Sequence, residues 1–220
     1  MSKETSLCVR NISKYYSIKD PSSGKKSQFW ALRDVSFELS KGVCLGLMGS
    51  NGSGKSTLLK IINRIITPTT GEIVINGSIA PLLDLGAGFH DELTGRENIY
   101  VYGSLIGIKR KELNQKLTEI VDFAEIGPFL DTKLRGYSNG MKVRLAFSVA
   151  SHLKPDILLA DEILAVGDEP FQQLCLKKMM DLKKSGTSII MVQHNEKVIQ
   201  SICDRTFLLK GGRLSDTDVS

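Results

Sequence analysis

Within the first forty residues, two stretches alternate between apolar and polar positions in the way that β-strands do. Apolar residues dominate positions 7–12, and Val35, Phe37 and Leu39 follow the period of two that a half-buried strand requires. A polar insert at positions 17–27, rich in Ser, Lys, Gly and Pro, separates the two stretches. The pattern predicts two strands with an exposed hairpin tip or loop between them.

The spacing of apolar residues changes further along the chain. An apolar run at 43–48 ends in a glycine-rich turn, and positions 55–66 have the spacing of a helix that Pro68 ends. Helical spacing dominates 86–152, most strongly at 97–106, 109–123 and 140–151. Strand-like runs occupy four other stretches: 71–77, 156–160, 188–192 and 205–209. Strands that alternate with helices indicate an α/β core with a mostly parallel sheet, into which the helical middle is inserted.

Composition and charge narrow the class of protein. Of 220 residues, 41% are hydrophobic and 24% are charged, which is typical of a globular domain and excludes a collagen-like or disordered chain. No apolar run approaches the roughly 18 residues of a membrane-spanning helix, and no signal-peptide segment follows Met1, so we expect the chain to stay in the cytoplasm. The four cysteines form no C-x-x-C pair, and we expect them to be buried like small hydrophobic residues. The net charge of +5 permits contact with nucleic acid or an anionic membrane, but without interleaved aromatic residues it favours a solvated face.

A motif with a defined chemistry follows the apolar run at 43–48. Its residues fit G-x-x-x-x-G-K-[ST] at each fixed position: Gly49, Ser50, Asn51, Gly52, Ser53, Gly54, Lys55 and Ser56. The glycines let successive backbone N–H groups point at phosphate oxygens, and the following helix adds its positive N-terminus. Lys55 would reach the β- and γ-phosphates, Ser56 would coordinate Mg²⁺, and Thr57 would donate to the α-phosphate. The motif therefore predicts a nucleotide-binding site.

Two adjacent acids end a later apolar strand. Asp161 and Glu162 follow residues 157–160. Beside a phosphate loop, Asp161 would hold Mg²⁺ through a water, and Glu162 would orient or deprotonate the attacking water. An ordinary strand end with solvated acids is the alternative interpretation. His194 follows the next apolar strand and would lie on the same edge of the sheet, where it could hydrogen-bond the γ-phosphate or the attacking water.

These residues, together with residues 137–142, resemble the ATP-binding subunit of ABC transporters. Ser138, Asn139 and Gly140 begin a stretch similar to the LSGGQ signature of that family, although Met141 and Lys142 differ from it. The resemblance implies an α/β P-loop NTPase core, a mostly parallel sheet flanked by helices, with an N-terminal antiparallel β region and an inserted helical subdomain. We expect one domain, 1–220, with the β region and core at 1–85 and 153–220 and the helical subdomain at 86–152.

The resemblance also implies how the site is completed. Two copies would form a head-to-tail homodimer around two ATP molecules, with Ser138 and Gly140 acting on the ATP of the partner. Asp168 occupies the D-loop position, and His194 occupies the H-loop position. Tyr16 resembles the aromatic residue that stacks on adenine, with simple strand packing of its ring as the alternative.

One family position departs from the pattern. A Gln that binds Mg²⁺ and senses the membrane partner normally ends the strand leading into the helical insertion, but the stretch 79–90 contains none. Counting back from Glu97 puts Leu85 at that position, with Asp84 beside it. Asp84 could supply an oxygen to the metal, and its charge would alter the site.

Three stretches, 82–98, 137–141 and 161–175, resemble one branch of the family, the bacterial exporters of O-antigen, capsule and wall teichoic acid. The branch implies an ATPase, with ATP and Mg²⁺ as ligands, that powers export of a lipid-linked polysaccharide through a separate integral-membrane permease. It places the chain on the cytoplasmic face of the bacterial inner membrane and gives it no nucleic-acid partner. Some members carry an extra C-terminal carbohydrate-binding domain, and we expect none here because the sequence ends at Ser220.

Other functions remain as alternatives. An ABC importer ATPase for a small molecule should show the usual Gln and a Gly-Gly-Gln signature, which this chain lacks. A soluble, non-transport ABC ATPase usually has two cassettes or a long coiled-coil insertion. A regulatory module that binds ATP without turnover should lack the acid or the signature.

The helix expected at 94–106 is a candidate for contact with the membrane subunit. Its apolar residues Ile99, Val101, Leu105 and Ile106 could belong to the core or dock a partner helix, and the core is favoured. Phe89 and His90, in the preceding glycine-rich loop, are better candidates for partner contact.

Overall fold

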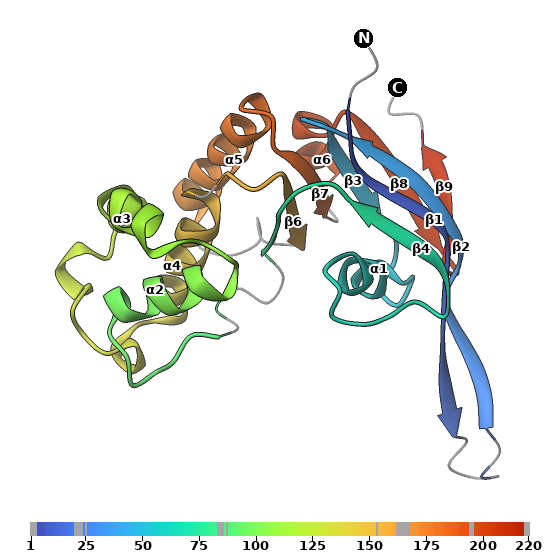
Figure 1. Ribbon diagram of the computed structural model, residues 1–220, viewed down its shortest axis with the longest axis horizontal. Coiled ribbons are helices and arrows are strands. Elements are labelled where there is room, and N and C mark those ends of the chain that lie inside the picture. The colour runs from blue at the N-terminus through green and yellow to red at the C-terminus, as the bar shows by residue number, and fades with distance from the viewer. Residues whose placement is uncertain are drawn as a thin grey trace.

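The computed structural model describes residues 4–19, 24, 26–82, 86, 88–152, 154–161, 168–193 and 196–217. Within these residues, the strands form two sheets, and a helical part stands apart from them (Figure 1). The expected Glu162, His194, Asp84 and Leu85 lie outside the described residues.

The smaller sheet is antiparallel and has the order β2-β1-β4. Its strands are β1 (Thr5–Lys19), β2 (Lys26–Ser40) and β4 (Thr70–Ile75). The pairing of β1 with β4 ends at Ser13, so the far ends of β1 and β2 form a two-stranded ribbon that projects from the body (Figure 1). Within the polar insert at 17–27, which we expected to be a hairpin tip or loop, β1 continues as far as Lys19 and β2 begins at Lys26.

The larger sheet has the order β5-β6-β7-β3-β8-β9, parallel from β5 to β8 and antiparallel at β9. Its strands are β3 (Cys44–Met48), β5 (Ile79–Leu82), β6 (Ile157–Asp161), β7 (Ser188–Val192), β8 (Arg205–Lys210) and β9 (Arg213–Thr217). The central strands are buried almost throughout because elements cover both faces. This arrangement confirms the predicted α/β fold with its antiparallel β region.

Three helices accompany the sheets: α1 (Lys55–Ile62), α5 (Glu169–Lys184) and α6 (Glu196–Ile202). The helical part comprises α2 (Gly95–Leu105), α3 (Arg110–Ala124), α4 (Asn139–His152) and the 3₁₀ turns Gly127–Phe129 and Leu134–Gly136. Helix α1 ends four residues earlier than predicted, because Arg64 adopts a left-handed φ of 58° before Pro68 is reached. None of the helices in the described ranges combines the length and apolarity needed to cross a bilayer.

The larger sheet separates two hydrophobic cores. Ile157 and Leu159 of β6 face one core, which α1 and the antiparallel sheet also line. Leu158 and Ala160 face the other, which lies under the helices α2 to α5. Neighbouring side chains of a strand point to opposite faces, so one short apolar strand serves both cores. The helical part and the antiparallel sheet therefore pack against opposite faces of the same larger sheet.

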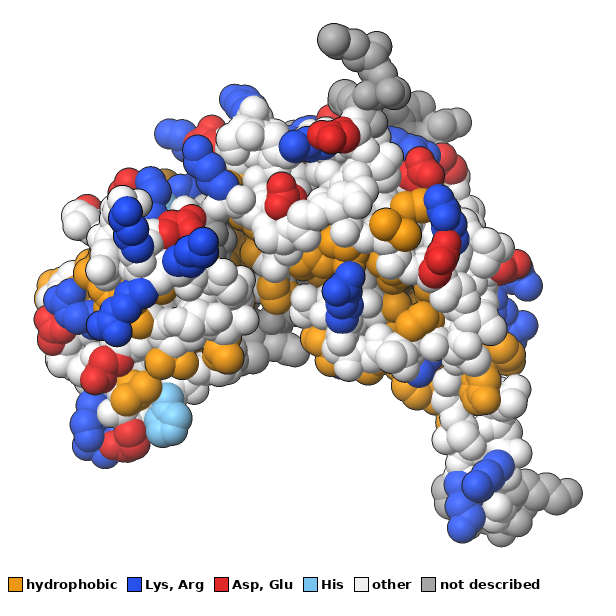
Figure 2. Space-filling model, in the orientation of Figure 1, with side chains coloured by type: hydrophobic (Ala, Val, Ile, Leu, Met, Phe, Trp, Pro, Cys, Tyr) orange, Lys and Arg blue, Asp and Glu red, His pale blue; other side chains and the backbone are white. Residues whose placement is uncertain are grey.

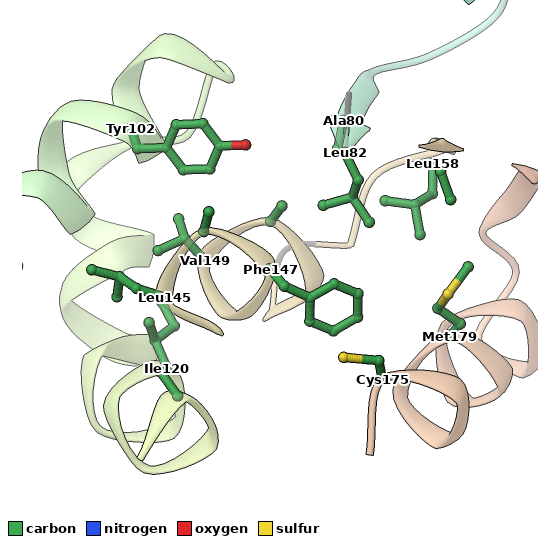
Figure 3. Packing of buried hydrophobic residues seen from close by; sticks show 14 of the residues in the cluster. Ala80, Leu82, Tyr102, Ile120, Leu145, Phe147, Val149, Leu158, Cys175 and Met179 are labelled. Atoms are coloured by element: carbon green, nitrogen blue, oxygen red, sulfur yellow. The ribbon is translucent and has the colours of Figure 1, made fainter. Parts of the chain in front are cut away.

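Packed aromatic rings join the helical part to α5. Phe147 of α4 is fully buried and stacks with Phe123 of α3 at 5.9 Å between ring centroids, while Phe171 of α5 lies 6.1 Å away, edge to face. Figure 3 shows the Phe147 ring between the side chains of α5 and those of the sheet. This cluster fixes the carboxyl half of α4 against the core.

Two cysteines that are far apart in the sequence lie in contact. The Sγ atoms of Cys44 and Cys203 are 3.4 Å apart, and both thiols are free. Cys8, Cys44 and Cys175 are buried, as expected, whereas Cys203 is half-buried. Burial raises the pKa of Cys175 to about 12, so this thiol stays protonated at neutral pH.

Replacement of Phe147 by Ala should lower the free energy of unfolding by about 3 to 5 kcal/mol, because a cavity would open between α4 and α5. Urea denaturation followed by circular dichroism measures this change. The matched control is Phe129→Ala, at a side chain that is 48% exposed, and we expect a change of about 0.5 kcal/mol there. Equal losses in the two variants would contradict the assigned core.

Candidate functional site

The phosphate loop joins β3 to α1 at the carboxyl edge of the larger sheet. Gly54 is the N-cap residue of α1, and no side chain in the described part of the chain caps this N-terminus. The first N–H groups of a helix have no partner within the helix and carry its partial positive charge. An uncapped helix start beside a glycine-rich loop is therefore suited to bind phosphate.

Close backbone contacts hold the loop in place. Gly54 has φ of 111°, and a Cβ atom there would lie 2.4 Å from the carbonyl oxygen of Ala31 in β2. The turn between β8 and β9 is hydrogen-bonded to the phosphate loop and to β2. Gly212 N–H donates to Ser53 O (3.2 Å), and Arg33 N–H donates to Gly212 O (2.7 Å). The phosphate loop is thus clamped between the antiparallel sheet and this turn.

Two side chains of the loop are placed for a phosphate ligand. Lys55 is buried, and its ammonium donates to the carbonyl oxygens of Gly49 (2.7 Å) and Ser50 (3.0 Å), so it lies inside the curve of the loop. The Ser53 hydroxyl is buried and has no hydrogen-bond partner among the residues that the structure describes. A buried polar group without a partner is destabilising, and an oxygen-rich ligand would supply the missing hydrogen bond.

A pocket of about 380 Å³ opens beside the loop. The described residues that line it come from the loop, from α1 and from the projecting ribbon: Tyr16, Phe29, Ala31, Asn51, Gly52, Gly54, Lys55, Ser56 and Thr57. The structure therefore brings Tyr16 to the phosphate loop, and this residue is 40% exposed. Phe29, which the sequence analysis did not identify, lies opposite Tyr16 across the ribbon.

Asp161 lies on the same edge of the sheet as the phosphate loop. The strand register pairs Leu47 of β3 with Val192 of β7, and Val192 with Asp161 of β6. Two strand spacings place the Cα of Asp161 about 10 Å from that of Leu47. The oxygens of Ser56 and Asp161 are the hard ligands that Mg²⁺ prefers, and Mg²⁺ usually keeps several waters and substrate phosphate oxygens as well. The part of the chain that the structure describes holds no group of three or more His, Cys, Asp and Glu suited to a metal ion.

The signature residues begin α4. Ser138 and Asn139 are exposed, and Gly140 is half-buried. The Ser138 hydroxyl accepts a hydrogen bond from Met141 N–H (3.2 Å) and so caps the helix. None of the three is among the described residues that line the pocket at the phosphate loop, and Figure 1 shows α4 in the helical part, apart from α1.

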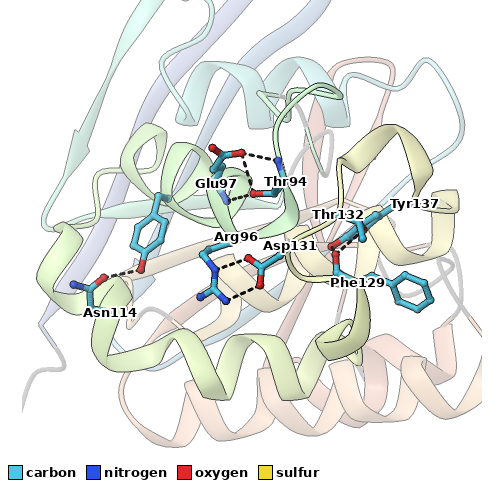
Figure 4. Close-up of polar contacts among 9 residues, drawn as sticks. Thr94, Arg96, Glu97, Asn114, Phe129, Asp131, Thr132 and Tyr137 are labelled. Atoms are coloured by element: carbon cyan, nitrogen blue, oxygen red, sulfur yellow. Dashed lines mark hydrogen bonds and ion pairs between the residues drawn. The ribbon is translucent and has the colours of Figure 1, made fainter.

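The loop that leads into α4 is fixed by polar contacts (Figure 4). The Tyr137 hydroxyl donates to Phe129 O (2.7 Å), and the Arg96 guanidinium binds both carboxylate oxygens of Asp131 (2.7 and 3.0 Å). This hydrogen-bonded ion pair lowers the pKa of Asp131 below its ordinary value. Thr94 and Glu97 form a capping box at the start of α2. Ser138 is therefore presented by a well-supported loop.

Arg144 connects α4 to the predicted D-loop aspartate. Its guanidinium donates to Asp168 Oδ1 (2.7 Å), pairs with Glu125 at the end of α3, and lies 4.7 Å from the Phe171 ring centroid. The Arg144 side chain is only 19% exposed. Asp168 is the N-cap residue of α5, so one cation links the helix that begins at the signature-like residues to the start of α5.

Comparison with known proteins identifies the family that these features fit. The ABC transporter family model matches residues 32–165. The chain is 45% identical over 192 residues to the O-antigen export system ATP-binding protein RfbB of Klebsiella pneumoniae, covering 87% of this chain and 78% of that protein. It is 42% identical over 214 residues to the teichoic acids export ATP-binding protein TagH of Enterococcus faecalis (strain ATCC 700802 / V583), covering 97% of this chain and 48% of that protein. The chain therefore spans about half the length of the TagH relative.

The fold also matches a solved structure. A dimeric ATP-binding cassette in a post-hydrolysis state, bound to ADP and Pi, superposes with a TM-score of 0.80 over 96% of this chain and 98% of that chain. The two sequences are 23% identical, so the likeness concerns the fold alone.

Replacement of Ser53 by Ala should stabilise the nucleotide-free protein and weaken the stabilisation that Mg·ATP produces. Removal of a buried hydroxyl without a partner should raise the unfolding free energy of the nucleotide-free protein by about 1 kcal/mol. The same change should reduce the rise in melting temperature that Mg·ATP produces, because a donor to phosphate is lost. Thermal unfolding with and without Mg·ATP tests both, with Ser104→Ala, an exposed serine of α2, as the control. A lower stability of the free variant, or an unchanged ATP effect, would contradict this role of Ser53.

Proposed function

Because this chain belongs to the ABC transporter family, we propose that it is the ATP-hydrolysing subunit of an exporter. The substrate that we propose is a lipid-linked cell-envelope polysaccharide of O-antigen, capsule or teichoic acid type. The phosphate-loop pocket, lined by Tyr16 and Phe29 beside the N-terminus of α1, supports ATP binding. The 45% identity to an O-antigen export ATP-binding protein supports the export of a polysaccharide.

The pocket would bind the triphosphate of ATP along the loop and α1. The Lys55 ammonium would exchange its bonds to loop carbonyl oxygens for bonds to the β- and γ-phosphates. Thr57 would donate to the α-phosphate, and the Tyr16 ring would stack on adenine. Ser56 and Asp161 would hold Mg²⁺, which neutralises developing charge on the phosphates when bound.

Hydrolysis would use groups at the ends of two neighbouring strands. Glu162 follows Asp161, the last residue of β6, and His194 follows Gln193 at the end of β7. Glu162 would orient the water and accept its proton as the water oxygen attacks the γ-phosphorus. The bond between that phosphorus and the β–γ bridging oxygen breaks, and ADP leaves with the electron pair. His194 would hydrogen-bond the γ-phosphate.

The site would be completed by a second copy of the chain. Ser138 and Gly140 lie in the helical subdomain, which we propose to span 86–152, and Ser138 is exposed at the start of α4. In a head-to-tail homodimer, this helix start would approach the γ-phosphate on the partner. Asp168 would lie at the centre of this dimer. Through its ion pair with Arg144, a shift of Asp168 would also move α4. Both halves of the site occur in one chain, which favours a homodimer over a heterodimer.

The surface that would meet an integral-membrane permease lies on the helical part. Ile99 is fully buried, whereas Val101 is 37% and Leu105 is 65% exposed, so the apolar residues of α2 divide between core and surface. Phe89 packs against Tyr102 at 5.3 Å between ring centroids and is half-buried, whereas His90 is exposed.

A hollow of about 340 Å³ lies beside this apolar surface, lined by Gly86, Phe89, His90, Asp91 and Lys142. Figure 2 shows hydrophobic side chains next to a histidine on the helical part. An apolar patch beside a hollow suits a short helix of a partner. Attachment there would hold the chain at the cytoplasmic face of the inner membrane as a peripheral subunit, with the permease contacting the polysaccharide.

Glu162→Gln should abolish turnover and leave ATP binding intact. We expect at least a 100-fold lower rate of phosphate release, because the general base is lost, and an accumulated ATP-bound dimer in size-exclusion chromatography with light scattering. Glu169→Gln, at an exposed acid at the start of α5, is the control and should hydrolyse ATP normally. A normal rate in the Glu162 variant would show that another group is the base.

Leu105→Asp should release the chain from its membrane partner, because a charge would enter the apolar contact. The measurement is co-purification of a polytopic membrane protein from gently solubilised native membranes, with basal ATP hydrolysis as the check on folding. Leu174→Asp introduces the same charge at a 41% exposed leucine of α5 and should retain the partner. Retention by both variants would place the docking surface elsewhere.

A further inference from the structure

We propose that Phe29 is a second ring of the base-binding platform and that it stacks, together with Tyr16, against the purine of ATP. The inference rests on the proposed function, in which the pocket at the phosphate loop binds ATP. It assigns to β2 a role in nucleotide binding that the motifs of the sequence did not indicate.

The register of the ribbon places the two rings side by side. Tyr16 of β1 pairs with Phe29 of β2, and directly opposite residues of an antiparallel pair project from the same face. Both residues line the pocket, and Phe29 is 50% exposed. Two large rings that stay open above a phosphate-binding loop offer π faces on which a base can stack.

Strand alternation shows which rings of the ribbon face the nucleotide. Phe29 and Ala31 of β2 both line the pocket, although the register of β1 and β2 shifts between Trp30 and Leu32. Trp30 lies between them and points the other way, where it packs against Tyr15 at 5.2 Å. The ribbon therefore has one aromatic pair packed on itself and another directed to the pocket.

The position of Phe29 relative to the phosphates is set by backbone contacts. The carbonyl oxygen of Ala31 lies against Gly54, the N-cap residue of α1, and against Gly212. Phe29 lies two positions before Ala31 on the strand, a distance of about 7 Å. The Phe29 ring is thus held at a defined distance from the helix N-terminus that would bind phosphate, even though the ribbon itself projects from the sheet (Figure 1).

Stacking by two hydrocarbon rings predicts a particular specificity. Every base has a π face, so stacking is tolerant of base identity. The described lining nearest Phe29 on its own strand is the methyl group of Ala31, which offers no hydrogen bond to a base edge. Loss of Phe29 should therefore weaken ATP and GTP by the same factor and leave inorganic triphosphate, which has no base, unaffected.

Isothermal titration of the full chain with Mg·ATP, Mg·GTP and Mg·tripolyphosphate tests the inference. Phe29→Ala should raise the Kd for both nucleotides about tenfold and leave the Kd for tripolyphosphate unchanged. Phe29→Tyr should restore nucleotide affinity. The matched control is Ile18→Ala, at a 47% exposed residue of the same ribbon that is not among the described pocket residues, and its affinities should equal those of the unaltered protein.

Each outcome separates this inference from the proposed function. If the unaltered protein binds none of the three ligands, the proposed ATP site itself is wrong. If the unaltered protein binds ATP and Tyr16→Ala weakens it, but Phe29→Ala stays within twofold, the second ring is refuted. An equal loss of tripolyphosphate and ATP binding in Phe29→Ala would also refute it, because the ribbon would then act through the phosphate loop.

Discussion

The contact between the carbonyl oxygen of Ala31 and Gly54 joins the two sheets at the point where the site is built. A Cβ atom on Gly54 would lie 2.4 Å from that oxygen, so only glycine permits the approach. The contact seats β2 against the start of α1, and Gly212 closes the clamp from the turn between β8 and β9. Aromatic residues of the antiparallel sheet can therefore stand over a phosphate loop that belongs to a different sheet.

Strand β6 connects the two hydrophobic cores to the edge of the sheet that carries the site. Alternate residues of β6 support both cores, and β6 ends in Asp161 at the edge that carries the phosphate loop. Arg144 then ties the start of α5 to α4, whose own N-terminus presents Ser138. A movement of α5 would therefore also move α4 and Ser138. In the proposed dimer, this connection would couple the start of α5 to the ATP site that the two copies share.

Contiguous motifs could be predicted from the sequence, and contacts between distant segments could not. The phosphate loop is one run of residues between a strand and a helix, and the structure has it in that context. The role that we propose for Tyr16 came from family resemblance, whereas that of Phe29 came only from the register that pairs the two residues across the ribbon.

The end of α1 depends on the left-handed backbone of Arg64, for which the sequence has no signal as clear as Pro68. The contact between Cys44 and Cys203 depends on the parallel pairing of β3 with β8, which brings together segments 159 residues apart. Sequence periodicity indicates which face of an element is buried, but it does not indicate which distant element covers that face.

The most direct test of this account is the rate of phosphate release from ATP by the purified chain, measured over a range of protein concentrations and compared with Lys55→Ala. In the dimer that we propose, one chain supplies the phosphate loop and its partner supplies Ser138, so the rate per chain should rise with protein concentration and should vanish in the Lys55 variant. A rate per chain that is independent of concentration, or that survives the substitution, would contradict the account.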